Sequence, residues 1–327
     1  MTPRPSAPLE PPTVAEAEAA RIRLDGRVTR TPLLSLEGDD GAETMALKLE
    51  CLQPIGSFKI RGALNAMAIA GPAALEQGVY TGSAGNMAQG LAYGARILGI
   101  PCRVVVPDSA PRAKLDAIER LGATSVPVPF DDWWTVLREH GHPEEPGHFI
   151  HPVADPAVIA GNATLGLEIL EDAPDVDTIV VPFGGGGLAC GIASVVKTLK
   201  PGVRVYAAEV ASAAPLAASM RAGAPAEVER VPSFVDGIGA GALLPEMWPM
   251  ASALLDGSIV VSLDEVRAAI RLLVRRAHVV AEGAGAAPVA ACLRAKSGLG
   301  RTVAVVSGGN IDAAVLARIM TDDPPER

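Results

Sequence analysis

Apolar residues in this chain fall into two kinds of segment that alternate along most of its length. Short apolar runs typical of buried strands occupy residues 102–106, 177–182 and 302–306. Residues 113–121, which follow the first run, repeat apolar positions at helical spacing. Because strands that are separated by helices pair in parallel, the pattern predicts an α/β fold with parallel sheets flanked by helices.

A strand, a tight turn and a helix are predicted between residues 45 and 67. Residues 45–50 alternate apolar and polar, and apolar positions over 60–67 recur at helical spacing. We expect Ser57 to cap the helix through its hydroxyl, which leaves Lys59 in the first turn. The positive end of the helix dipole and partial burial both lower the pKa of an amine there.

A neutral amine at physiological pH is what a Schiff-base nucleophile requires, so Lys59 is a candidate catalytic residue. The alternative is an ordinary lysine whose apolar stem is covered while its ammonium reaches water. The local pattern leaves both interpretations open.

A run of four glycines separates the predicted strand 177–182 from a helix that begins near Leu188. Glycines let backbone amides approach an anion closely, and a helix start adds favourable partial charge. The run therefore predicts a phosphate site, although a glycine-rich turn without a ligand is the simpler alternative.

Two further turns carry polar side chains at the ends of predicted strands. Ser83-Ala84-Gly85-Asn86 leads into a helix, and Ser307 follows the strand 302–306. Open α/β sheets bind ligands at the carboxyl ends of their strands. Each segment taken alone can also be a polar turn without a ligand.

Taken together, these segments resemble the pyridoxal-phosphate enzymes of fold type II, most closely the threonine/serine dehydratase and serine racemase branch. The resemblance covers nearly the whole chain, through residues 56–62, 83–90, 149–152, 158–161, 184–188, 279–285 and 307–312. It implies the two-domain, tryptophan synthase β-like fold with pyridoxal 5'-phosphate as cofactor. A small mobile domain of residues 71–153 would be inserted into a large cofactor-binding domain made of residues 1–70 and 154–327.

The resemblance also implies roles for individual residues. Lys59 would carry the cofactor as a Schiff base and act in catalysis, Phe58 would lie beside the cofactor, and Asn86 would hydrogen-bond its ring hydroxyl. The remaining cofactor contacts would be the phosphate-binding amides and the ring neighbours, which are Gly184, Gly185, Gly186, Gly187, Leu188, Gly237, Glu282 and Ser307. The substrate carboxylate would be held by the loop of Ser83, Ala84, Gly85, Asn86 and Met87.

The implied reaction is β-elimination. A neutral serine hydroxyl opposite the ring nitrogen makes the ring a weaker electron sink, which favours loss of a β-substituent over transamination. The expected activity is dehydration and deamination of a β-hydroxy amino acid, L-threonine or L-serine, to a 2-oxo acid and ammonia.

Several alternatives remain within this family. Phenylserine and hydroxyaspartate are possible substrates, and Met87, where the family usually has histidine, leaves the preference open. An amino-acid racemase is a further alternative. Racemases of this branch use a serine where this chain has Ala84, and they carry asparagine where it has Val153, so both positions favour elimination.

A dinucleotide-dependent oxidoreductase is the competing enzyme class. The G-x-G-x-x-A pattern runs from Gly184 to Ala189. Glu209 ends the next predicted strand, at the sequence spacing of the acidic residue that contacts a ribose in dinucleotide sites. This interpretation leaves Lys59 and Ser307 unexplained. A catalytically silent binding protein on the same scaffold is a third alternative, and the presence of Lys59 is evidence against it.

A metal site is not expected. Some relatives bind a divalent cation through a glutamate, a backbone carbonyl and an aspartate, and Glu209 and Ala213 match the first two. Pro215 stands in place of the aspartate. Hard cations need several oxygen ligands, so the set is incomplete.

Composition and net charge limit the classes of molecule that the protein is expected to bind. The 327 residues are 49% hydrophobic, which suits two domains with substantial cores, and the net charge is -9. An acidic surface repels nucleic acid and anionic membranes, so the expected partners are an amino-acid substrate and copies of the same chain, as a homodimer or homotetramer. Four cysteines without disulfide-like spacing, and no recognisable signal or membrane-spanning segment, predict a cytoplasmic protein.

Overall fold

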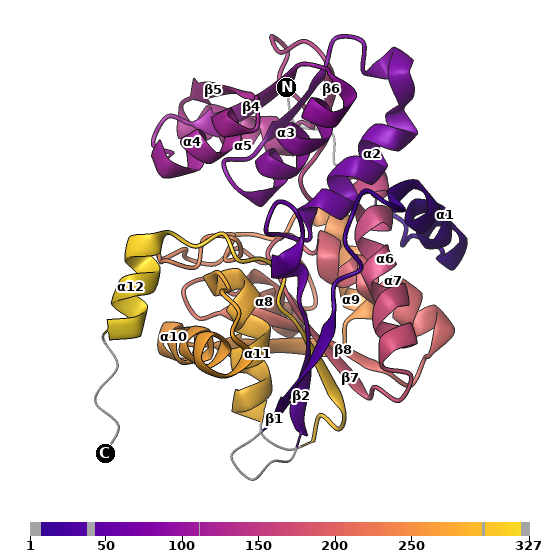
Figure 1. Ribbon diagram of the computed structural model, residues 1–327, viewed down its shortest axis with the longest axis vertical. Helices are drawn as coiled ribbons and strands as arrows, with labels where there is room; N and C mark the ends of the chain where they lie inside the picture. The colour runs from indigo at the N-terminus through magenta and orange to yellow at the C-terminus, as the bar shows by residue number, and fades with distance from the viewer. Residues whose placement is uncertain (1–7, 38–42, 111, 296–297, 322–327) are drawn as a thin grey trace.

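Two sheets organise the chain in a computed structural model, which describes residues 8–37, 43–110, 112–295 and 298–321 (Figure 1). The larger sheet consists of β1 (Leu33–Glu37), β2 (Glu43–Lys48), β7 (Thr178–Pro182), β8 (Arg204–Val210), β9 (Gly257–Val261) and β10 (Thr302–Val305). The smaller sheet consists of β3 (Val79–Gly82), β4 (Cys102–Pro107), β5 (Thr124–Val128) and β6 (His148–Phe149). Their strand orders are β1-β2-β10-β7-β8-β9 and β5-β4-β3-β6.

Helices cover both sheets. Those around the six-stranded sheet are α1 (Val14–Leu24), α6 (Pro156–Asp172), α7 (Gly187–Leu199), α8 (Pro215–Ala222), α9 (Trp248–Leu254), α10 (Leu263–Leu272), α11 (Gly283–Ala295) and α12 (Ala313–Thr321). Those of the four-stranded unit are α3 (Asn86–Leu98), α4 (Arg112–Arg120) and α5 (Phe130–Arg138). Helix α2 (Lys59–Ala74) runs between the two units (Figure 1). Short helical turns occupy Glu50–Leu52, Pro245–Met247 and Leu273–Ala277.

The predicted α/β fold with parallel sheets is confirmed, with one difference at an edge. Strand β1 pairs with β2 in the antiparallel direction, with Leu34 opposite Leu47. All other pairings between the named strands are parallel. A short connection joins β1 to β2, and a short connection permits only an antiparallel pair.

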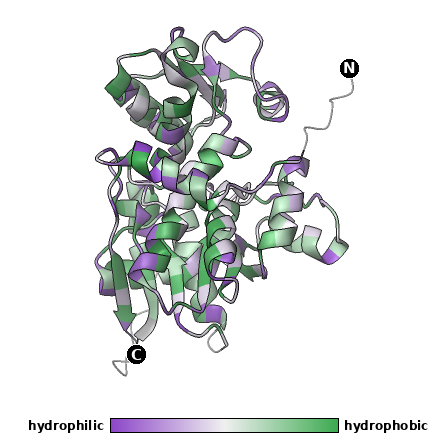
Figure 2. Ribbon diagram, turned by 90° about the vertical axis from the view of Figure 1, so that its right-hand side faces the viewer, coloured by the Kyte–Doolittle hydropathy of each residue, from purple (hydrophilic) through white to green (hydrophobic). Residues whose placement is uncertain are grey.

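The six-stranded sheet is buried on both faces, because successive side chains of a strand point to opposite sides. In β7, Ile179 and Val181 belong to the apolar layer that also contains residues of α6 and α7. Val180 belongs to the layer on the other face, which contains residues of α10 and α11. Figure 2 shows the result, with green predominating along the strands and purple in short patches.

The polar positions of the predicted strand 45–50 do not face water, as an alternating pattern would suggest. Lys48 and Glu50 are both 0% exposed. Each forms an ion pair with a residue of another element, Glu168 of α6 for Lys48 and Arg61 of α2 for Glu50. The strand ends at Lys48, and the alternating polar side chains at its end and in the turn that follows are buried in ion pairs.

No helix in the described ranges is long and apolar enough to cross a lipid bilayer.

Helices α2, α6 and α7 pack closely because glycines face their neighbours. A Cβ atom on Gly161 would lie 2.6 Å from the carbonyl oxygen of Arg61, and one on Gly191 would lie 2.7 Å from that of Ile159. Both separations are shorter than side chains tolerate, so a larger residue would push the helices apart. This close packing fixes the positions of α2, α6 and α7 relative to one another.

We expect Gly191→Ala to lower the free energy of unfolding by about 1–3 kcal/mol, because overpacking outweighs the better helix propensity of alanine. Gly202→Ala is the matched control, since a Cβ there would meet nothing within 4 Å. It should change stability by less than about 0.5 kcal/mol. Urea denaturation measures both variants, and equal stability for Gly191→Ala and wild type would contradict the packing argument.

Candidate active site

The turn before α2 is docked against the end of β10. Gly56 has a φ of +69°, and a Cβ there would lie 2.8 Å from Oδ1 of Asn310. The Gly309 amide donates to the Gly56 carbonyl at 2.9 Å, and the Phe58 amide donates to the Ser307 carbonyl at 3.0 Å. These contacts bring the first turn of α2 beside the strand end that carries Ser307.

The helix cap differs from the sequence prediction. Helix α2 begins at Lys59, and the residue before it is Phe58, whose own backbone is helical with φ −54° and ψ −23°. The Ser57 hydroxyl accepts a hydrogen bond from the Lys59 amide at the long distance of 3.4 Å. Ser57 therefore lies one residue before the N-cap position, and its hydroxyl reaches only the first helical amide. Its backbone forms an isolated bridge with Gly308. The placement of Lys59 in the first turn is confirmed.

The Lys59 side chain is partly buried. Its Nζ donates to the Pro152 carbonyl at 2.6 Å and lies 5.3 Å from the centre of the Phe58 ring. Burial lowers the pKa of Lys59 to about 8, although the nearby Glu282 carboxylate acts in the opposite direction. The predicted lowering of this pKa is confirmed, and burial is its main cause. A useful fraction of the amine is therefore neutral near physiological pH.

A buried histidine shapes the turn that presents the Pro152 carbonyl. Nδ1 of His151 accepts hydrogen bonds from the amides of Val153 and Ala154, at 3.0 and 2.7 Å. Its Nε2 must then carry the proton, which it donates to the Leu137 carbonyl at 3.2 Å. Burial lowers the pKa of His151 to about 3, so the ring stays neutral. The sequence showed His151 only as part of a motif, and this supporting role was missed.

Asn86 connects the two units across the candidate site. Its Nδ2 donates to Oε1 of Glu282 at 2.7 Å, and its Oδ1 accepts from Nδ2 of Asn310 at 2.8 Å. Burial raises the pKa of Glu282 to about 7, against the effect of the Asn86 hydrogen bond. Asn310 is a further site residue that sequence reasoning missed, although it lies in the motif that follows Ser307.

Two glycines leave room beside Glu282. A Cβ on Gly308 would lie 2.5 Å from Oε1 of Glu282, and one on Gly237 would lie 3.6 Å from the same oxygen. Gly237 also borders the glycine run, because a Cβ on Gly184 would be 3.2 Å from the Gly237 carbonyl oxygen. The residues predicted to border the ring therefore lie on one continuous surface.

The glycine run between β7 and α7 offers unpaired amides. In the described ranges, no protein group accepts a hydrogen bond from the amides of residues 184–188. Gly186 has a φ of +96°. A Cβ on Gly185 would lie 2.5 Å from the Val153 side chain, and one on Gly187 would lie 2.9 Å from the Val153 carbonyl oxygen. Only glycine fits there, and the free amides suit a phosphate group.

The loop of residues 83–87 lies at the start of α3. The Ser83 hydroxyl accepts a hydrogen bond from the Gly85 amide at 3.2 Å, and a Cβ on Gly85 would meet open space. The Ala84 side chain packs on the apolar cluster of the four-stranded unit. Met87 is 1% exposed inside that cluster, so its thioether faces the core and only its backbone can face a ligand.

Glu209 has a local structural role. Its two oxygens accept hydrogen bonds from the amides of Leu216 and Ala217, at 2.9 and 2.8 Å, and from the Ser258 hydroxyl at 2.5 Å. The carboxylate therefore caps the start of α8, where Pro215 is the first residue. A carboxylate used in this way is not available for a ribose, which removes one of the two features that favoured a dinucleotide site. Among the described residues, no group of histidine, cysteine, aspartate and glutamate side chains could hold a metal ion.

Comparisons with known proteins found a matching family, similar sequences and similar structures. The model of the family described as pyridoxal-phosphate dependent enzyme matches residues 24–308. The chain is 40% identical to an L-threonine ammonia-lyase of Thermotoga maritima over 315 residues, covering 94% of this chain and 78% of that protein. It is 36% identical to a serine racemase of Rattus norvegicus over 323 residues, covering 95% and 97%. The structure of a maize serine racemase superposes with a TM-score of 0.86 at 32% identity, covering 96% and 98%.

The reactivity of Lys59 should follow its pKa. Only the neutral amine attacks an aldehyde, so reductive methylation of Lys59 in the cofactor-free protein should accelerate through a midpoint near pH 8. Ionised Glu282 favours the ammonium form, so Glu282→Gln should move the midpoint to lower pH. Mass spectrometry of the Lys59 peptide measures the rate.

Glu229→Gln, at an exposed position, is the control and should leave the midpoint unchanged. A wild-type midpoint near 10.4, the value of an ordinary lysine, would contradict the proposed withdrawal of Lys59 from water.

Proposed function

The chain belongs to the family of pyridoxal-phosphate dependent enzymes, and from that premise we propose that it is an ammonia-lyase for β-hydroxy amino acids, with L-threonine and L-serine as leading substrates. The observation that carries the proposal is the withdrawn amine of Lys59, which donates to the Pro152 carbonyl at 2.6 Å and has a pKa of about 8. A neutral amine at this place is suited to both aldehyde capture and proton abstraction.

The residues present fit pyridoxal 5'-phosphate. The unpaired amides of residues 184–188 would bind the phosphate, Lys59 would take the aldehyde, and Phe58 would lie beside the ring. Asn86 would reach the ring hydroxyl, Ser307 would face the ring nitrogen, and Gly237 and Glu282 would border the ring. When bound, the cofactor supplies the stabilisation of negative charge at the substrate Cα.

The chain's own residues would perform the proton transfers and hold the substrate. Lys59 would take the Cα proton on Nζ, and the Pro152 carbonyl would accept a hydrogen bond from the resulting ammonium. The Ser83 hydroxyl and the amides of residues 84–87 would hold the substrate carboxylate. The proton held on Nζ would then pass to the Cβ hydroxyl, which leaves as water, and the released enamine tautomerises and hydrolyses to a 2-oxo acid and ammonia.

Two positions favour elimination over racemisation. A racemase needs a second acid/base group on the face of the substrate opposite the lysine, and Ala84 has no proton to exchange. Val153 packs its side chain towards Gly185 and has no polar group. Racemisation, and the bulkier substrates phenylserine and hydroxyaspartate, are the remaining candidates within the family.

We also propose that residues 71–153 move as a small domain against residues 1–70 and 154–327. Support comes from the break in α2, where Gly71 has a φ of +73° and Pro72 follows. In this conformation the two units are in contact through Asn86 with Glu282 and Lys114 with Asp236, which a movement would break or remake. Closure on substrate would complete the site.

Two broader proposals concern the cell and the assembly. We propose a cytoplasmic location, which the four free cysteines support, since three of them are buried. We propose a homodimer or homotetramer from the family resemblance, and light scattering on the purified protein measures the assembly.

The purified protein should absorb visible light, and it should form a 2-oxo acid when L-threonine, L-serine or L-threo-phenylserine is supplied separately. Lys59→Ala should lose that absorption and lower turnover by roughly 10²- to 10⁴-fold, because the variant lacks the proton acceptor. Lys200→Ala, at the end of α7, is the control and should keep both properties.

A colourless wild type that cannot be reconstituted with pyridoxal 5'-phosphate, or wild-type turnover by Lys59→Ala, would contradict the proposal. A coloured protein that forms no 2-oxo acid but changes the chirality of serine would favour the racemase.

A further inference from the structure

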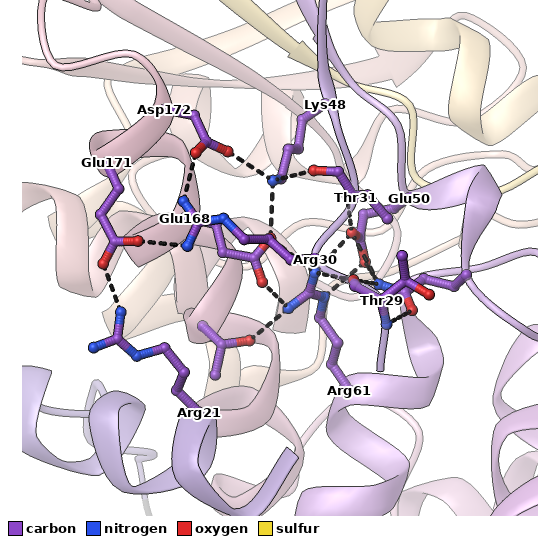
Figure 3. Close-up of polar contacts among 12 residues, drawn as sticks. Arg21, Thr29, Arg30, Thr31, Lys48, Glu50, Arg61, Glu168, Glu171 and Asp172 are labelled. Carbon is purple, nitrogen blue, oxygen red and sulfur yellow. Dashed lines mark hydrogen bonds and ion pairs between the residues drawn. The ribbon is translucent and has the colours of Figure 1, made fainter. Parts of the chain in front are cut away.

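A cluster of buried charges surrounds Arg61, which follows Lys59 by two residues in the first turn of α2 (Figure 3). Arg61 is 1% exposed, and its guanidinium lies between the carboxylates of Glu50 and Glu168. Nε and one terminal nitrogen of Arg61 contact the two oxygens of Glu50 at 2.8 and 2.9 Å. Its two terminal nitrogens contact the two oxygens of Glu168 at 2.6 and 3.1 Å. The guanidinium is thus bound by the carboxylate of Glu50 on one side and that of Glu168 on another.

These contacts fasten α2 to the unit built on the six-stranded sheet. Glu50 follows β2, and Glu168 belongs to α6. Arg61 also donates to the Thr164 hydroxyl at 3.1 Å and to the Thr29 carbonyl at 3.3 Å. Burial and the opposing charge of Arg61 act against each other on Glu50, and the net result is a lowered pKa, so the carboxylate stays charged.

The other side of α2 packs against the four-stranded unit. Ala63 and Met67 of α2 belong to the same apolar cluster as Leu91 of α3. The two helices come very close near the first turn, because a Cβ on Gly90 would lie 3.2 Å from the Lys59 carbonyl oxygen. Movement of the four-stranded unit would therefore pull on the helix that carries the catalytic amine.

We propose that Arg61 is a positioning residue for Lys59, which holds the first turn of α2 on the six-stranded unit while the rest of the helix packs against the four-stranded unit. This inference rests on the proposed role of Lys59. Residues 59 and 61 are about 200° apart around a helix, so one side chain can be anchored while the other faces the site. A planar guanidinium suits this role because it can bind two carboxylates with fixed geometry.

Lys48 provides a matched control within the same cluster. It is 0% exposed and shares Glu168 with Arg61, through an Nζ to Oε2 contact of 2.8 Å. It also contacts Asp172 at 3.2 Å and the Thr31 carbonyl at 2.7 Å. Lys48 belongs to β2 and not to the helix of Lys59. A purely stabilising cluster predicts similar consequences for the two cations, whereas positioning predicts different ones.

The test compares Arg61→Lys with Lys48→Met in the full chain. Arg61→Lys keeps the charge but loses the paired hydrogen bonds to Glu50 and Glu168. We therefore expect kcat to fall by about 10- to 100-fold with little change in KM. The pH midpoint of Lys59 methylation should rise towards that of an ordinary lysine, because a loosened turn admits water. Lys48→Met should lower the urea midpoint yet keep kcat and the Lys59 midpoint near wild-type values.

Glu50→Gln is a second variant, which weakens the grip on Arg61 while leaving α2 unchanged in sequence. It should shift kcat and the Lys59 midpoint in the same direction as Arg61→Lys. The inference is overturned if Arg61→Lys keeps both wild-type values, or if Lys48→Met changes both as strongly. A wild type that forms no 2-oxo acid would defeat the proposed function alone, because the methylation midpoint still tests the positioning of Lys59 in each variant.

Discussion

Partial withdrawal of one amine from water is the constraint on which the rest of this structure depends. Lys59 loses part of its solvation, and in the described part of the chain it has no carboxylate at contact distance and only the Pro152 carbonyl as a hydrogen-bond acceptor. A carboxylate at contact distance would restore the charged form and remove the reactivity of the amine. The neighbouring Glu282 moderates the effect, and its own pKa is raised to about 7 by burial.

Keeping a lysine in this state requires rigid surroundings, because an unpaired amine otherwise moves towards water. The turn 151–154 supplies the acceptor and is itself fixed by the neutral ring of His151. The docking of residues 56–58 against residues 307–309 fixes the start of the helix. Both the turn and the helix start are fixed by backbone amides and carbonyls. Glycine is required at position 56 because its φ is positive and because a Cβ there would contact Asn310 too closely.

Val153 lies between the glycine run of residues 184–187 and the carbonyl that binds the Lys59 amine. This residue follows Pro152 and packs against Gly185 and Gly187, so the amine and the run of unpaired amides share one wall. A phosphate and an aldehyde on one small molecule would be bound by these two features at the same time. Such a pairing explains more of the structure than a dinucleotide does, since Glu209 is already used to cap α8.

The sequence by itself determined the α/β class, the order of the motifs and the first-turn position of Lys59, because periodicity and glycine spacing act over a few residues. Only the tertiary structure decided how Lys48 and Glu50 are used, because their partners Glu168 and Arg61 lie in other elements. It also decided that Met87 faces the core and that β1 runs antiparallel. The acceptor for Lys59 is 93 residues away in sequence. Contacts at such separations depend on how the sheets and helices assemble, which a local pattern does not contain.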